Sequence, residues 1–152
     1  MTRDVHTTAA ERLELEGQRY TPQRRRLVEI LLSAGQPLTI PGILHGHADM
    51  KQSSVYRNLA ALEQAGVVWR VATDEEYGSY ELSEELTRHH HHLICRSCGR
   101  VEDVTIPADL EQRIDRTLDR VARKSGFATV AHRLDLIGIC RECAAAAGTA
   151  PT

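Results

Sequence analysis

Residues 87–100 read TRHHHHLICRSCGR, with four consecutive histidines just before a Cys-x-x-Cys pair. The run lies inside the chain and continues into apolar residues, unlike a terminal purification tag. Successive side chains of a β-strand point to opposite faces, so we expect His89 and His91 on one face and His90 and His92 on the other. Neutral imidazole is the commonest metal ligand. The stretch therefore predicts a strand that serves metal sites on one or both faces; solvated or stacked surface histidines are the alternative.

The cysteines of the chain form two Cys-x-x-Cys pairs and no others are present: Cys95, Cys98, Cys140 and Cys143. Each pair brings two sulfurs together, and four thiolates can surround a zinc ion tetrahedrally. A structural Zn²⁺ site is therefore expected, with a pair of redox dithiols as the alternative. Such a zinc would tie the end of the chain to the histidine strand and add folding free energy to a small domain.

The chain has 152 residues, of which 41% are hydrophobic and 26% charged, as in soluble globular proteins. No apolar run approaches the roughly 20 residues of a membrane span, and the N-terminus lacks the apolar core of a secretory signal. A cytoplasmic protein without a membrane partner is expected, and there cysteines serve as metal ligands or redox groups more often than as disulfides. Residues 1–72 carry a net charge of +2 and the remainder −4, so any basic surface must be local.

Helix signals dominate the first half of the chain. We expect helices over residues 6–17 and within 21–35, 37–48 and 51–66. Thr21 and Thr39 are candidate N-caps, each followed within two residues by a proline. Residues 67–82, VVWRVATDEEYGSYEL, read as two strands joined by a polar turn. Three short helices followed by a hairpin predict a winged helix-turn-helix domain.

The helix expected over residues 51–66 has two contrasting faces. Apolar positions at helical spacing form one face: Val55, Leu59 and Leu62. Small, polar and cationic side chains lie roughly opposite: Ser53, Tyr56, Arg57 and Ala60. The second face suits a DNA major groove, where serine and arginine hold phosphates, arginine reads guanine and tyrosine contacts a thymine methyl. An ordinary amphipathic helix with a solvated face fits the spacing equally well.

From about residue 88 the pattern changes to strands around one helix. Strands are expected over 89–95, 99–106 and 129–140, and a helix over 107–124. The fold class is therefore α+β, a winged-helix domain followed by a small α/β domain with a four-cysteine zinc site. We expect a DNA-binding domain over residues 1–85, a metal-binding domain over 86–145 and a disordered tail over 146–152.

The histidine strand needs further nitrogen or oxygen ligands to complete its sites. Order along the chain offers four candidates: Glu81, Asp103, Glu111 and His132. Composition alone does not assign them to one strand face or the other. Imidazole and carboxylate sets suit Fe(II), Mn(II), Zn(II) or Ni(II) without selecting among them.

Four segments, in this order, closely resemble the ferric uptake regulator (Fur) family of bacterial metal-dependent transcription factors: RYTPQRRRLVEIL, SSVYRNLAALEQAGVV, YELSEELTRHHHHLICRSCGRVEDV and HRLDLIGICREC. The resemblance covers about residues 10–143. It implies an N-terminal winged-helix DNA-binding domain and a C-terminal α/β dimerisation domain. The implied partners are a second copy of the chain and double-stranded DNA with an inverted-repeat operator, with no small organic substrate.

Residue by residue, the resemblance implies three metal sites and a DNA-contacting set. The structural zinc ligands are Cys95, Cys98, Cys140 and Cys143. The regulatory site at the hinge between domains takes Glu81, His90, His92 and Asp103. The second site, inside the dimerisation domain, takes His89, His91, Glu111 and His132. The DNA contacts are Arg19, Ser53, Ser54, Tyr56 and Arg57.

One departure from the family concerns the regulatory site. The family often adds a histidine from the DNA-binding domain, and that position here is Gln36 or Pro37. Gln36 offers only a weak amide oxygen. His45 or His47 could substitute, although a structural role at helix ends is the simpler expectation for both.

The regulatory cation is expected to be Fe²⁺, with Zn²⁺ and Mn²⁺ as alternatives. All cysteines are assigned to the structural site, so the sensing site lacks the thiolate that often marks the family's zinc sensors. Glu81 in place of an aspartate leans away from the peroxide-sensing type. The nitrogen-and-oxygen ligand set does not itself select among the three ions.

The expected function is a metal-responsive DNA-binding regulator, most simply a repressor. A zinc- or peroxide-sensing member of the same family is an alternative. A zinc-storage or redox-switch protein would leave the face of Tyr56 and Arg57 without a role. An enzyme is not expected, because the chain has no His-x-Glu, no cysteine pair after proline, no nucleophile elbow and no phosphate loop.

Overall fold

The computed structural model describes residues 4–71, 78–129 and 131–148. The chain forms two compact units that divide between Arg88 and His89. The first is a helical winged-helix unit, and the second is an α/β unit that carries the four-cysteine cluster. The predicted α+β class is therefore confirmed. In the described parts of the chain, no helix is both long and apolar enough to cross a membrane.

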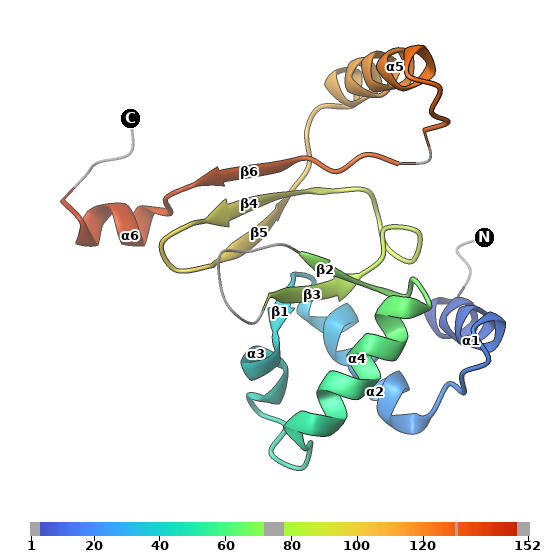
Figure 1. Cartoon of the computed structure of the whole chain (residues 1–152). Helices are drawn as coiled ribbons and strands as arrows, with labels where there is room; N and C mark the ends of the chain where they lie inside the picture. The colour runs from blue at the N-terminus through green and yellow to red at the C-terminus, as the bar shows by residue number, and fades with distance from the viewer. Residues whose placement is uncertain (1–3, 72–77, 130, 149–152) are drawn as a thin grey trace. The chain divides into compact units, whose positions relative to one another are not determined.

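The first unit packs short helices against a small antiparallel sheet (Figure 1). Its helices are α1 (Val5–Leu15), α2 (Pro22–Ala34), α3 (Ile40–Leu44) and α4 (Gln52–Gln64). Its strands are β1 (Leu38–Thr39), β2 (Val68–Val71) and β3 (Ser79–Leu82), in the order β1-β3-β2. Helices α2, α3 and α4 followed by the β2–β3 hairpin make the predicted winged helix-turn-helix. The predicted turn at 72–77 lies outside the described residues.

Capping side chains fix where the helices of this unit begin. The Thr21 hydroxyl accepts a hydrogen bond from the Arg24 N–H before α2, and the Thr39 hydroxyl accepts one from Gly42 before α3. Both predicted N-caps are therefore confirmed. The helices then bury one continuous core: Ala9, Leu13, Leu27, Val28, Leu31, Ile40, Ile43, Val55, Leu59 and Leu62. Each fully buried leucine or isoleucine stabilises the fold by roughly 1.5–3 kcal/mol, which holds α4 firmly in place.

The second unit is built on a three-stranded sheet with β4 in the middle (Figure 1). Its elements are β4 (His91–Cys95), β5 (Val101–Val104), α5 (Ala108–Lys124), β6 (Asp135–Gly138) and α6 (Arg141–Ala146). Strand β5 pairs antiparallel with β4, and β6 pairs parallel with its other edge. The parallel pairing brings a segment some forty residues further along the chain beside the histidines and the first cysteine pair.

All three predicted strands of the second unit are shorter than expected, including β5, which covers Val101–Val104 of the predicted 99–106. Strand β4 begins at His91, which pairs with Val104 at the end of β5, so His89 and His90 precede the paired part of the strand. Strand β6 begins at Asp135, opposite His92, so the prediction that His132 lies within this strand is wrong. Of the predicted disordered tail, residues 149–152 lie outside the described residues.

Helix α5 exposes its apolar stripe. In the single chain none of its residues is buried. Large apolar side chains stand exposed on and just after it: Leu110, Leu118, Val121 and Phe127. Strand β6 adds exposed Leu136 and Ile137. Apolar surface of this extent in a small unit marks an interaction face.

Candidate metal centres and DNA-binding surface

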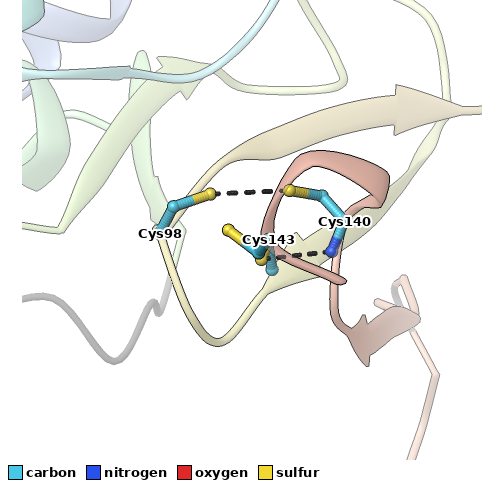
Figure 2. Close-up of side chains that lie close together, drawn as sticks. Cys98, Cys140 and Cys143 are labelled. Carbon is cyan, nitrogen blue, oxygen red and sulfur yellow. Dashed lines mark hydrogen bonds between the residues drawn. The ribbon is translucent and has the colours of Figure 1, made fainter. Parts of the chain in front are cut away.

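The four cysteines of the second unit converge into one cluster, and Figure 2 shows three of them, Cys98, Cys140 and Cys143, with their side chains close together. The parallel pairing of Cys95 with Gly138 sets the two Cys-x-x-Cys turns side by side. The sulfurs of Cys98 and Cys140 are 3.8 Å apart, and all four sulfurs lie within 4.8 Å of one another. Four sulfurs at this separation fit a single tetrahedral ion, for which Zn²⁺ is the usual choice.

Backbone donors prepare Cys95 for this role. The Cys140 N–H donates to the Cys95 sulfur at 3.3 Å. Together with the N–H of Cys98, this hydrogen bond lowers the pKa of Cys95 to about 6. The thiolate is the form that binds a metal, so Cys95 is available as a ligand at neutral pH.

A second cluster gathers around the carboxylate of Glu111 in the first turn of α5. His89 Nε2 lies 2.9 Å from Glu111 Oε1, and His91 Nε2 lies 2.9 Å from Oε2. His132 Nε2 lies 3.0 Å from Oε1. The hydrogen bond from His91, together with the nearby histidines, lowers the pKa of Glu111 below its usual value. The carboxylate therefore lies among three imidazoles from two segments of the chain, His89 and His91 before and at the start of β4 and His132 before β6.

One unpartnered nitrogen in this cluster, His132 Nε2, suits a bound cation. His91 Nδ1 and His132 Nε2 are buried and have no hydrogen-bond partner in the described structure; His132 Nε2 is near Glu111 but not aligned for a hydrogen bond. A buried polar atom without a partner costs about 1–3 kcal/mol. Ligation of a divalent cation by His132 would remove that cost for Nε2. The nitrogen and oxygen donors thus fit a metal such as Fe(II), Mn(II) or Zn(II).

A third cluster of the second unit joins His90 and His92 to Asp103 on β5. His90 Nε2 lies 3.9 Å from Asp103 Oδ2, and His92 Nε2 lies 4.0 Å from Oδ1. Ligand atoms that share one ion through bonds of about 2.1 Å are themselves about 3–4 Å apart. Glu81, the expected fourth ligand, is buried on β3 of the first unit.

The odd and even histidines thus separate as the alternation predicts, although two of the four precede the strand. The ring centroids of His89 and His91 are 4.8 Å apart, and those of His90 and His92 are 5.0 Å apart. Each pair meets a different carboxylate, and the structure brings Glu111 and His132 to the odd pair.

Two aspartates beside these clusters were not singled out from the sequence. Asp115 lies 3.0 Å from His132 Nδ1, and Asp135 lies 3.0 Å from His92 Nδ1. Asp115 follows Glu111 by one helical turn, so the helical spacing could have predicted that both carboxylates lie on the same face of α5. Asp135 is placed by the parallel register of β6, for which the sequence holds no local signal.

The positions that could have replaced the family's missing histidine form no cluster of their own. Gln36 is exposed and Pro37 is buried. His45 ends α3, and His47 Nδ1 lies 3.4 Å from the guanidinium of Arg26. Among the described residues, neither histidine belongs to a group that could hold a metal.

Helix α4 presents the predicted polar face. Val55, Leu59 and Leu62 are buried, whereas Ser53, Tyr56, Arg57 and Ala60 are exposed. Within the helix, the Arg57 Nε donates to the Ser53 carbonyl at 3.4 Å.

Two further residues that the resemblance assigns to DNA binding, Ser54 and Arg19, make hydrogen bonds to neighbouring segments. The Ser54 hydroxyl donates to the Gln23 side chain on α2 at 3.0 Å, a hydrogen bond that lies at the protein surface. Arg19 has an exposed side chain, and its carbonyl accepts from the Arg24 guanidinium at 2.6 Å. The loop before α2 is therefore held while the Arg19 side chain stays accessible.

A winged-helix unit joined to an α/β unit with metal-ligand clusters defines a metal-binding transcriptional regulator. The model of the Ferric uptake regulator family matches residues 15–137, and the chain belongs to this family. Its members are metal-responsive regulators of transcription rather than enzymes, and they bind DNA as dimers.

Individual relatives differ in what their names say they sense. The ferric uptake regulation protein of Cupriavidus metallidurans is 41% identical over 98 residues, a match that spans 64% of each chain. The peroxide operon regulator of Bacillus subtilis is 30% identical over 139 residues, covering 89% of this chain and 90% of the relative. The solved Helicobacter pylori ferric uptake regulator superposes with a TM-score of 0.69 at 25% identity, covering 93% and 95% of the two chains.

Proposed function

We propose that this chain is a repressor whose DNA-competent dimer is set by a divalent cation, with Fe(II) favoured over Zn(II) and Mn(II). The observation that carries the proposal is the separation of four adjacent histidines onto two carboxylates, Glu111 and Asp103. A storage protein needs a large number of metal sites, whereas two distinct small sites in a chain that also carries a winged helix suit sensing. A regulator of transcription works where the DNA is, which in a bacterium is the cytoplasm.

In this proposal the regulatory ligands come from both units. Glu81 lies on β3 of the winged-helix unit, while His90, His92 and Asp103 belong to the α/β unit. A cation held by both sets fixes the angle between the units. In a two-fold dimer that angle decides whether two recognition helices meet major grooves one helical turn apart on an inverted repeat. The coupling free energy between metal binding and DNA binding is typically about 1–3 kcal/mol. Because coupling is reciprocal, DNA binding strengthens metal binding by the same free energy.

The DNA surface in this proposal combines α4 with the loop before α2. Tyr56 and Arg57 contact bases or phosphates in the major groove of the DNA. Ser53 and Ser54 lie near the sugar-phosphate backbone of the DNA, and Arg19 enters the minor groove. The exposed face of α4 and the accessible Arg19 side chain support this assignment. The structural ion at the four-cysteine cluster is assigned as Zn²⁺.

A peroxide-sensing regulator is the second candidate. It is favoured by the B. subtilis relative, whose similarity extends over most of both chains. Loading the protein with Fe(II) and exposing it to hydrogen peroxide separates the two. A peroxide sensor should lose DNA binding after this exposure, whereas a metal sensor should keep it as long as Fe(II) is resupplied.

A gel shift with metal titration tests the main proposal. The wild-type dimer should retard operator DNA only when the cation is added, with an affinity that falls steeply with salt. The double variant His90→Ala/His92→Ala should remain a folded dimer and lose this response. An undiminished metal response in the double variant would reject the regulatory assignment, and retardation of no DNA under any metal would favour storage.

A further inference from the structure

His92 has a carboxylate on each side. In the sheet order β5-β4-β6, the residues opposite His92 are Asp103 on one neighbouring strand and Asp135 on the other. Paired residues of neighbouring strands project from the same face of a sheet, so these three side chains form one row. Asp103 already belongs to the proposed regulatory site, whereas Asp135 has no part in it.

The two carboxylates meet different nitrogens of the imidazole. His92 Nδ1 is hydrogen-bonded to Asp135 Oδ1 at 3.0 Å, whereas Nε2 lies 4.0 Å from Asp103 Oδ1. An ionised carboxylate only accepts hydrogen bonds, so the proton of this pair resides on Nδ1. In a neutral imidazole the lone pair then lies on Nε2, on the side of Asp103.

Burial makes this orientation firm. The His92 side chain is 3% exposed and that of Asp135 is 29% exposed. The imidazole end of the hydrogen bond is therefore shielded from water. The matching contact in the other cluster, between His132 and Asp115, involves an aspartate that is 57% exposed, and it is correspondingly open to solvent.

We propose that Asp135 is a positioning residue of the regulatory metal site, which holds His92 as the Nδ1–H tautomer with Nε2 directed at the cation. This inference rests on the proposed function for the identity of the site. Carboxylates that accept the second N–H of a metal-binding histidine fix the ring and raise its basicity, and their loss costs about 10–100-fold in metal affinity. Asp135 acts through His92 and does not itself contact the cation.

Substitutions at Asp135 separate a hydrogen-bond role from a charge role. Asp135→Asn keeps an oxygen acceptor in the same place, while Asp135→Leu removes it; Asp135→Ala serves the same purpose if leucine disturbs the sheet. Glu102→Ala is the matched control, because it removes one carboxylate from the neighbouring row of the same sheet, where Glu102 pairs with Arg100 instead of a histidine.

The experiment uses the full-length dimer with zinc in its four-cysteine site. Imidazole ¹⁵N NMR without added metal reports the tautomer of His92, and EPR of free Mn(II) reports binding at the site that His92→Ala abolishes. Wild type, Asp135→Asn and Glu102→Ala should show the Nδ1–H tautomer, and Asp135→Leu should lose it. Mn(II) affinity should fall about 10–100-fold in Asp135→Leu, less in Asp135→Asn, and stay unchanged in Glu102→Ala.

Two results would overturn the role of Asp135 and leave the metal site standing. One is a wild-type tautomer and Mn(II) affinity in Asp135→Leu while His92→Ala is defective. The other is an equal loss in Asp135→Asn and Asp135→Leu, which points to direct ligation or charge. Normal Mn(II) binding by His92→Ala would instead reject the regulatory site itself, and the role of Asp135 with it.

Discussion

At the scale of single residues, Tyr20 links α1 to the loop that precedes α2. Its hydroxyl lies 2.8 Å from His6 Nδ1, and burial raises the pKa of Tyr20 to about 12. Tyrosine in an unfolded chain ionises near pH 10, so the folded state holds the neutral form longer. The raised pKa therefore costs nothing below about pH 10, and it lowers stability progressively as the pH rises from about 10 toward about 12, because the unfolded chain loses its proton first.

Tyr20→Phe should therefore reduce the loss of stability at alkaline pH. Urea unfolding between about pH 9 and pH 11 gives the free energy of unfolding at each pH. The effect is the difference between wild type and Tyr20→Phe in how steeply this free energy falls with pH. Tyr56→Phe, on the exposed face of α4, should keep the wild-type slope. If Tyr20→Phe and wild type lose stability in parallel, the burial of Tyr20 does not govern its ionisation.

The residues that belong to the metal clusters were predictable to different degrees. The separation of odd from even histidines follows from the two-residue period of an extended chain, which continues through His89 and His90 even without strand pairing. The convergence of four cysteines follows from two Cys-x-x-Cys pairs in one chain. Asp135 could not be predicted, because its place beside His92 depends on a parallel register set by distant contacts.

At the scale of elements, the two faces of α4 have different roles: the buried face stabilises the fold, and the exposed face is expected to contact DNA. Leu59→Ala should lower the free energy of unfolding by about 2–5 kcal/mol, because this side chain is buried in the core. Arg57→Ala should change it by less than about 0.5 kcal/mol, because the side chain is exposed. Denaturant unfolding measures both.

The same pair of variants tests the DNA-binding face. Arg57→Ala should weaken DNA binding and make it less dependent on salt, measured by fluorescence anisotropy at several salt concentrations. Leu59→Ala should retain DNA binding in proportion to the fraction folded. Full DNA affinity in folded Arg57→Ala would remove this face from the DNA interface.

Element types were easier to predict than their ends. Threonine caps and prolines near the first turn placed α2 and α3 correctly, because those signals are local. The ends of β4 and β6 depend on which partner residues face them, which local propensity does not contain. The same reason explains why His132 lies before β6 rather than within it.

At the scale of the whole molecule, the exposed stripe of α5 is expected to be covered in the dimer that this family uses to bind DNA. Val121→Asp places a charge on that stripe, where Val121 is 58% exposed in the single chain. The variant should raise the dimer dissociation constant about tenfold or more, measured by sedimentation equilibrium. Arg116→Ala, on the opposite side of α5, should leave it unchanged. Equal dissociation constants for wild type and Val121→Asp would place the dimer interface elsewhere.

The central claim is that four adjacent histidines serve two separate ions. Metal counting on Mn(II)-loaded, zinc-containing protein tests it most directly, with His89→Ala/His91→Ala and His90→Ala/His92→Ala compared with wild type. Each double variant is predicted to lose one Mn(II) per chain and to keep the other, with the zinc of the four-cysteine site unchanged in both. Loss of both ions from either variant, or of neither, would contradict the account.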